Sequence, residues 1–165
     1  MRKCMAALAA FTLGFGAVGV QAAPPPTARP SGAVVQAAPV AVPDPDVQVM
    51  LVQTALSALN HANLTNDYSV LHALAAPAFQ SANSPDMLAA QFAAFRTANI
   101  DLTPAVLYRP RWSQPANVES GALRLLGKIP SAPQEVLFDI SYILENGRWR
   151  LAGLSVGLAA PSRAQ

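Results

Sequence analysis

Apolar residues recur every three or four positions from Asp46 onward, which is the spacing of one face of an α-helix. Asp46 is placed to act as an N-terminal cap, and the pattern predicts a helix over residues 46–62. A second helix is expected before Pro77, and the sequence Ser84-Pro85-Asp86 has the cap, proline and acid that begin a third. Three amphipathic helices therefore come first in the chain.

After Asn99 the apolar residues recur at every second position. These short runs of alternating apolar and polar residues, separated by prolines, predict strands. Asn146-Gly147 joins the last two runs and is typical of a type I′ hairpin turn, which would place Tyr142 and Trp149 on one face. The expected strands cover residues 105–112, 122–126, 135–145 and 148–156. Because the apolar face of this sheet must be covered, we expect an α+β domain in which the three helices pack on about four antiparallel strands.

The N-terminal residues predict export. Arg2 and Lys3 precede an apolar run that ends in Val20-Gln21-Ala22, a sequence with small residues at the two positions that a signal peptidase reads. We therefore expect a signal peptide over residues 1–22 and a periplasmic or secreted bacterial protein, with a retained membrane anchor as the alternative. After cleavage, no stable membrane span is expected.

Composition divides the rest of the chain into three parts. Residues 23–45 are rich in Pro and Ala with little charge, and such a segment is typical of an extended linker. We expect the folded domain over residues 46–157 and a flexible tail over residues 158–165.

Charge and cysteine content exclude several kinds of function. Without Arg2 and Lys3 the 11 basic residues fall to 9, which equals the 9 acidic residues, so we expect no nucleic-acid partner. Cys4, the only cysteine, lies in the leader, which removes disulfides and thiolate ligands from the mature chain. His61 and His72 lack a third ligand at a suitable spacing, so no metal and no cofactor are expected.

The run from Ala55 to Arg96, followed by strands that end in a Gly-Arg-Trp-Arg-Leu hairpin, resembles the nuclear transport factor 2-like superfamily. In particular, it resembles small exported bacterial members whose function is unassigned. The matching residues are Asn60, Asp67, Tyr68, Pro77, Phe79, Gly147 and Trp149. They are packing and turn residues over about 100 positions, so the resemblance implies a fold, a curved sheet wrapped around helices into a cone, rather than an activity.

Enzymes of this superfamily place a base and a hydrogen-bond donor inside the cone, and the residue types that match are His72, Asp101 and Tyr142. Each also has an ordinary structural role: a hydrogen-bonded rim residue for His72, a turn cap for Asp101 and packing for Tyr142. Tyr142 and Trp149 are in addition candidate ligand-binding residues, because they share the covered face of the sheet.

These patterns favour an exported, non-catalytic domain that binds a small apolar ligand or an envelope protein. One alternative is an isomerase-like or hydrolase-like enzyme with its site in the cone, and an inward acid or base near Tyr142 would favour it. Another is a structural envelope or secretion accessory protein, which a filled interior and an apolar outer sheet face would favour. A second copy of the chain, paired through the sheet, is a further candidate partner.

Overall fold

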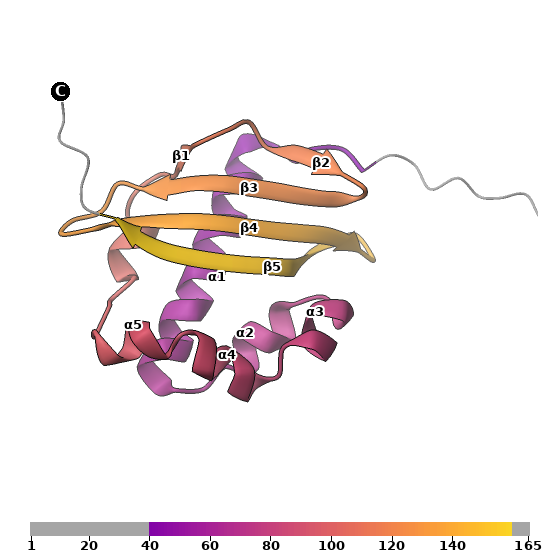
Figure 1. Ribbon diagram of the computed structural model, residues 1–165. Coiled ribbons are helices and arrows are strands. Elements are labelled where there is room, and N and C mark those ends of the chain that lie inside the picture. The colour runs from indigo at the N-terminus through magenta and orange to yellow at the C-terminus, as the bar shows by residue number, and fades with distance from the viewer. Residues whose placement is uncertain (1–39, 160–165) are drawn as a thin grey trace, which may run out of the picture. The chain divides into compact units, whose positions relative to one another are not determined.

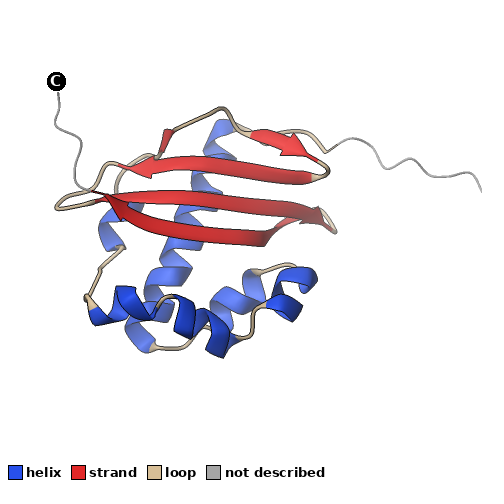
Figure 2. Cartoon of the chain, in the orientation of Figure 1, coloured by secondary structure: helices blue, strands red, loops and turns tan. Residues whose placement is uncertain are grey.

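The computed structural model describes residues 40–159, in which helices come first and an antiparallel sheet follows (Figures 1 and 2). The predicted α+β class is confirmed, whereas the signal peptide, most of the linker and residues 160–165 lie outside the described residues. The helices are α1 (Pro45–Thr65), α2 (Ser69–Leu74), α3 (Pro77–Ala82), α4 (Pro85–Gln91), α5 (Ala93–Thr97) and the 3-10 helix η1 (Thr103–Val106). The strands are β1 (Arg111–Trp112), β2 (Asn117–Glu119), β3 (Ala122–Ile129), β4 (Glu135–Glu145) and β5 (Arg148–Ala159).

Helix α1 confirms the first predicted element and extends it at both ends, but Asp46 is not the cap: it lies in the first turn, and Asp44 is the N-cap residue. Pro45 occupies the first turn, where its missing N–H costs nothing, and Asn66 ends the helix in the left-handed region with φ 55°. One stripe of the helix is buried against the sheet: Leu51, Val52, Ala55, Leu56, Leu59 and Ala62. None of the helices within residues 40–159 is long and apolar enough to cross a membrane.

The second expected helix is present as α2, the third is divided into α4 and α5, and α3 was not expected. Pro77 does not simply end the second helix but begins α3, since proline fits the first helical position. The third begins at the predicted cap, where the Ser84 hydroxyl accepts a hydrogen bond of 3.2 Å from the Met87 N–H. A break at Phe92 then separates α4 from α5.

The strand expected over residues 105–112 is wrong. Thr103–Val106 forms η1, and only Arg111–Trp112 pairs with β3. Leu102 and Ala105 are both fully buried at a spacing of three, which suits a 3-10 turn and not an alternating strand. The short strand β2 was not expected, and the sheet therefore has five strands in place of about four.

The sheet has the order β1-β3-β4-β5, with β2 also paired to β3, and all pairs are antiparallel. Strand β3 continues to Ile129, and β5 continues to Ala159, two residues beyond the expected end of the domain. The core lies between the sheet and the helices, and its largest fully buried side chains include Tyr68, Leu56, Leu71, Leu88, Leu125, Phe138 and Ile140.

The β4–β5 hairpin has the predicted turn. Asn146 and Gly147 have φ values of 51° and 74°, and a type I′ turn requires positive values at both positions. The turn pairs Tyr142 with Leu151 and Leu144 with Trp149, which places Tyr142 and Trp149 on one face as predicted. Leu144 nevertheless remains 41% exposed, so the covered part of this face ends before the turn.

A β-bulge in β5 changes which residues face the core. Ser141 pairs with Gly153 while Tyr142 pairs with Leu151, so Ala152 has no partner on β4. The inward face of β5 therefore shifts from Leu151 to Leu154, and both side chains are buried.

Candidate functional site

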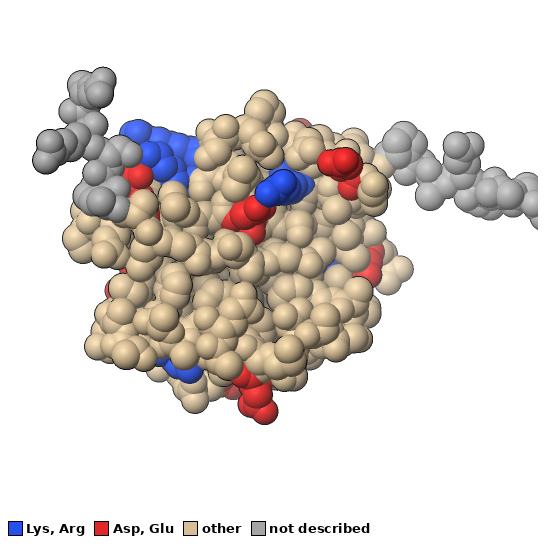
Figure 3. All heavy atoms as spheres, in the orientation of Figure 1, with Lys and Arg blue, Asp and Glu red and all other residues tan. Residues whose placement is uncertain are grey.

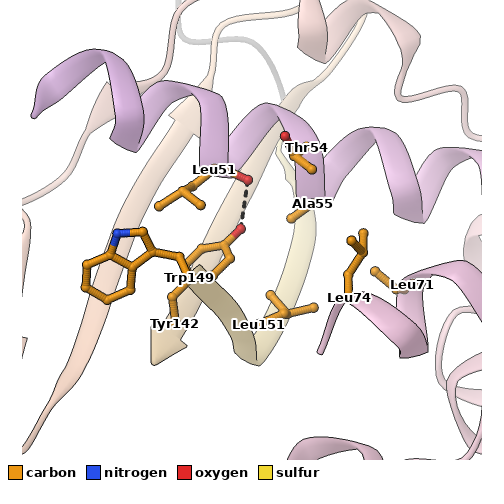
Figure 4. A pocket seen from close by; sticks show the side chains of 8 residues that line it. All are labelled: Leu51, Thr54, Ala55, Leu71, Leu74, Tyr142, Trp149 and Leu151. Atoms are coloured by element: carbon orange, nitrogen blue, oxygen red, sulfur yellow. Dashed lines mark hydrogen bonds between the residues drawn. The ribbon is translucent and has the colours of Figure 1, made fainter. Parts of the chain in front are cut away.

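An apolar cavity of about 60 Å³ lies between α1, α2 and the β4–β5 hairpin (Figure 4). Leu51, Thr54 and Ala55 line it from successive turns of α1, at the i, i+3 and i+4 spacing of one helix face. The other walls come from Leu71 and Leu74 of α2, Tyr142 of β4, and Trp149 and Leu151 of β5. In Figure 4, Trp149 lies at one end of the row and Leu71 and Leu74 at the other.

Tyr142 forms part of the wall of this cavity, as its position on the covered face predicted. Its hydroxyl donates a hydrogen bond of 2.7 Å to the backbone oxygen of Leu51, and the side chain is 4% exposed. Burial raises the pKa of Tyr142 above its usual value, so the phenol is neutral at physiological pH. The one proton of the hydroxyl is already donated to the main chain. The Tyr142 side chain therefore packs in the core with its polar group hydrogen-bonded within the protein.

Trp149, Leu74 and the exposed Thr54 form the accessible side of the cavity. Trp149 is half-buried and Leu74 is 38% exposed, whereas Ala55, Leu71 and Leu151 are buried. Apart from Tyr142, none of the lining residues carries a titratable group. The cavity can therefore hold an apolar group but offers no general base for proton transfer.

His72, the first candidate base, is not among the residues that line this cavity. Its Nε2 is 3.2 Å from the backbone oxygen of Gln80, and the Gln80 amide donates to the backbone oxygens of His72 and Ala75. This side chain joins α2 to α3, which is the structural role that the sequence offered as the alternative.

Asp101, the second candidate base, caps η1. Its Oδ1 accepts hydrogen bonds from the Thr103 N–H at 2.8 Å and the Asn60 amide at 3.3 Å. Hydrogen bonds from the Thr103 side chain and backbone hold the pKa of Asp101 below its usual range. Asp101 borders a separate cavity of about 440 Å³, which Val136 and Leu158 also line.

The structure therefore separates the candidates that an enzyme would need together. Val136, beside the cavity of Asp101, is six residues from Tyr142 on β4, and a strand rises about 3.4 Å per residue, which is roughly 20 Å along the sheet. Within residues 40–159, no group of three or more His, Cys, Asp or Glu side chains could hold a metal ion.

The outer face of the sheet carries an ion pair at its centre. Arg124 and Asp139 lie on neighbouring strands, and two hydrogen bonds join the guanidinium to the carboxylate, one of them from Nε at 2.9 Å. Arg124 holds the pKa of Asp139 below its usual range. Leu137 on the same face is 41% exposed, so apolar surface is present there but a charged pair interrupts it.

Sequence reasoning found two of the eight lining residues as candidates and missed the other six as such. Those six are Leu51, Thr54, Ala55, Leu71, Leu74 and Leu151. In the sequence, most of them are recognisable only as members of an apolar helix or strand face. The spacing of apolar residues is the same for residues in a filled core and for residues that line a cavity. No protein-family model, curated protein sequence or solved structure matches the chain.

Proposed function

We propose that this chain is an exported binding domain that receives one small apolar group in the cavity beside Tyr142 and Trp149 and performs no chemistry on it. The observation that carries the proposal is the nature of the cavity wall. Hydrocarbon makes up most of it, and its one buried hydroxyl is already bonded to Leu51. A pocket with these properties binds through burial of apolar surface.

The volume limits what the cavity accepts. An engineered cavity of about 150 Å³ is known to hold a benzene molecule, and the cavity here is about 60 Å³. The smaller cavity fits the branched end of an aliphatic chain and is too small for a fused ring system such as a steroid. The apolar group can belong to a small ligand or to a side chain of an envelope protein.

The resemblance to the nuclear transport factor 2-like superfamily supports a binding role within the same proposal. Members of that superfamily use the space between helices and sheet, and here this space is mostly filled by the core, with the small cavity beside Leu51 to Ala55 of α1. Export is part of the proposal on the strength of the leader sequence.

Isobutanol, a soluble probe with a branched aliphatic end, tests the proposal. In a Trp112→Phe background Trp149 is the remaining tryptophan of the chain, and its emission should change saturably as isobutanol enters the cavity. Ala55→Val should weaken this binding about tenfold or more, because the added methyl groups fill the space in a close-packed site. Ala58→Val, one turn along α1 and outside the wall of this cavity, is the matched control.

Two results would contradict the proposal. The first is isobutanol binding, measured by calorimetry, with unchanged Trp149 emission. The second is equal binding in the Ala55→Val and Ala58→Val variants, which would place the binding site elsewhere.

A further inference from the structure

The cavity of about 440 Å³ that Asp101 borders shares no lining residue with the cavity beside Tyr142. One wall is the connection between α5 and η1, residues 98–101, and another is the connection between β3 and β4, residues 131–134. Figure 1 shows both connections at the same end of the sheet. The volume lies within the range of about 300 to 1,000 Å³ that is usual for sites of small molecules.

Hydrogen bonds within the protein hold both connections in place. The Ser131 hydroxyl donates to the Gln134 backbone oxygen at 2.8 Å, within the β3–β4 connection. The Ile100 N–H donates to the Phe95 backbone oxygen at 2.9 Å, which fixes the other connection to α5. Because the fold itself positions these walls, a ligand would not have to order a loop when it binds.

The lining of this cavity combines apolar surface with a polar rim. Three residues that present hydrocarbon are buried or half-buried: Ile100, Val136 and Leu158. Three polar residues are exposed: Asn99, Asp101 and Gln134. A site of this kind binds by covering apolar surface of the ligand, while a few polar groups fix the orientation of the ligand.

Asp101 is the charged residue of this lining, and the other residues that line the cavity are neutral. Hydrogen bonds from Thr103 and Asn60 fix its carboxylate and favour the ionised form. Within residues 40–159, no lysine or arginine forms an ion pair with Asp101. Figure 3 shows that charged side chains are sparse over the face of the domain that it presents, so few other anions there would compete for a cation. The complementary ligand therefore carries one positive charge.

The apolar lining favours an organic cation over a metal ion, because a single carboxylate supplies too few ligands for a metal. An ammonium group has three N–H donors. Asn99 and Gln134 each have an amide oxygen, and neither side chain has a hydrogen-bond partner in the described part of the chain. We propose that this cavity binds a primary aliphatic amine in its ammonium form, with the charge at Asp101 and the hydrocarbon against Val136 and Leu158.

Cyclohexylammonium chloride is a suitable probe, because a six-membered ring needs about 150 Å³ and the cavity beside Tyr142 has about 60 Å³. The probe replaces sodium chloride in an NMR titration, so that the ionic strength stays constant. The backbone amide signals of Thr103, Val136 and Leu158 should shift saturably. Cyclohexanol, a neutral molecule with the same ring, should bind about fivefold more weakly, as expected for the loss of one exposed ion pair.

Asp101→Asn should weaken binding of cyclohexylammonium about fivefold as well. Asparagine keeps the side-chain oxygen that accepts the Thr103 N–H, so η1 should retain its cap. Asp67→Asn is the matched control, because Asp67 Oδ1 accepts the Ser69 N–H at 2.9 Å in the same way but lies outside the lining of this cavity. Its affinity for cyclohexylammonium should be unchanged.

Gln134 allows a test in both directions. Its side chain is exposed, and the bond to Ser131 uses its backbone oxygen, so substitutions should leave the fold intact. Gln134→Glu should tighten binding of cyclohexylammonium, and Gln134→Lys should weaken it.

Four results would each overturn the proposal. They are no saturable shift at the three amides, equal affinity for cyclohexanol, equal affinity in the Asp101→Asn and Asp67→Asn variants, and the same shifts with sodium chloride alone. The last of these would assign the site to an inorganic cation. Failure here leaves the proposal for the cavity beside Tyr142 intact, because the two tests use different residues and different probes.

Discussion

At the scale of single residues, Tyr142 and Asp101 illustrate how a polar group is satisfied by its surroundings. Tyr142 is buried and donates its proton to the main chain of α1, whereas Asp101 is exposed and accepts hydrogen bonds from Thr103 and Asn60. Asn60 is itself buried and also accepts from the Leu102 N–H at 2.8 Å, so it fixes the segment that begins η1. These polar groups stabilise the fold, and none is left free to act on a ligand in the apolar cavity.

Tyr142→Phe should separate stability from binding. Loss of the hydrogen bond to Leu51 should lower the free energy of unfolding by about 0.5 to 1.5 kcal/mol, as for a typical neutral hydrogen bond. Affinity for isobutanol should change little, because the hydroxyl is already committed to the protein. Urea denaturation and the Trp149 titration measure the two quantities. A large loss of affinity with unchanged stability would show that the hydroxyl serves the ligand instead.

At the scale of elements, the β4–β5 hairpin holds the cavity together, since Tyr142, Trp149 and Leu151 all lie within it. Arg150 also links the hairpin to α2, because its guanidinium donates hydrogen bonds to the backbone oxygens of Ala73 and Ala75. The turn sets the register of the pairs that form one wall of the cavity, so its backbone geometry affects both stability and the site.

Gly147→Val should lower the free energy of unfolding by about 1 to 3 kcal/mol, because a β-branched residue is forced to a positive φ. A Cβ at this position would meet no atom within 4 Å, so the cost comes from the backbone alone. Gly147→Asn is the matched control, since asparagine tolerates this conformation. Denaturant titration of both variants measures the difference. Equal stability of the two would show that the turn does not hold its type I′ geometry in solution.

At the scale of the whole molecule, the described domain closes its own core. Helix α1 supplies a long buried stripe, and the described segment before it contributes mainly contacts at the helix start. The Gln48 side-chain amide donates a hydrogen bond of 2.8 Å to the Pro43 backbone oxygen. The Gln48 backbone N–H donates one of 3.0 Å to the Asp44 backbone oxygen. We therefore expect the residues just before α1 to stabilise the domain.

A chain shortened to begin at Val40 should unfold cooperatively and melt within a few degrees of the longer protein. A chain that begins at Asp46 should melt lower, because it lacks both partners of Gln48. Calorimetry of the two shortened chains measures the difference. Loss of cooperative unfolding in the chain from Val40 would show that the upstream residues belong to the domain.

The sequence by itself determined the features that depend on local chemistry. Periodicity located α1, Ser84 located the start of α4, and Asn146-Gly147 located the turn that pairs Tyr142 with Leu151. Each of these follows from residues within a few positions of one another, so the amino-acid types carry the information.

Only the tertiary structure decided the rest. The bulge at Ala152 and the 3-10 turn at Ala105 depend on the elements packed against them, because a short apolar run is compatible with a strand or with a helical turn. The partner of the Tyr142 hydroxyl is a backbone oxygen 91 residues earlier in the chain. Every residue has such an oxygen, so no side chain in the sequence marks Leu51, and the packing of α1 on β4 alone selects it.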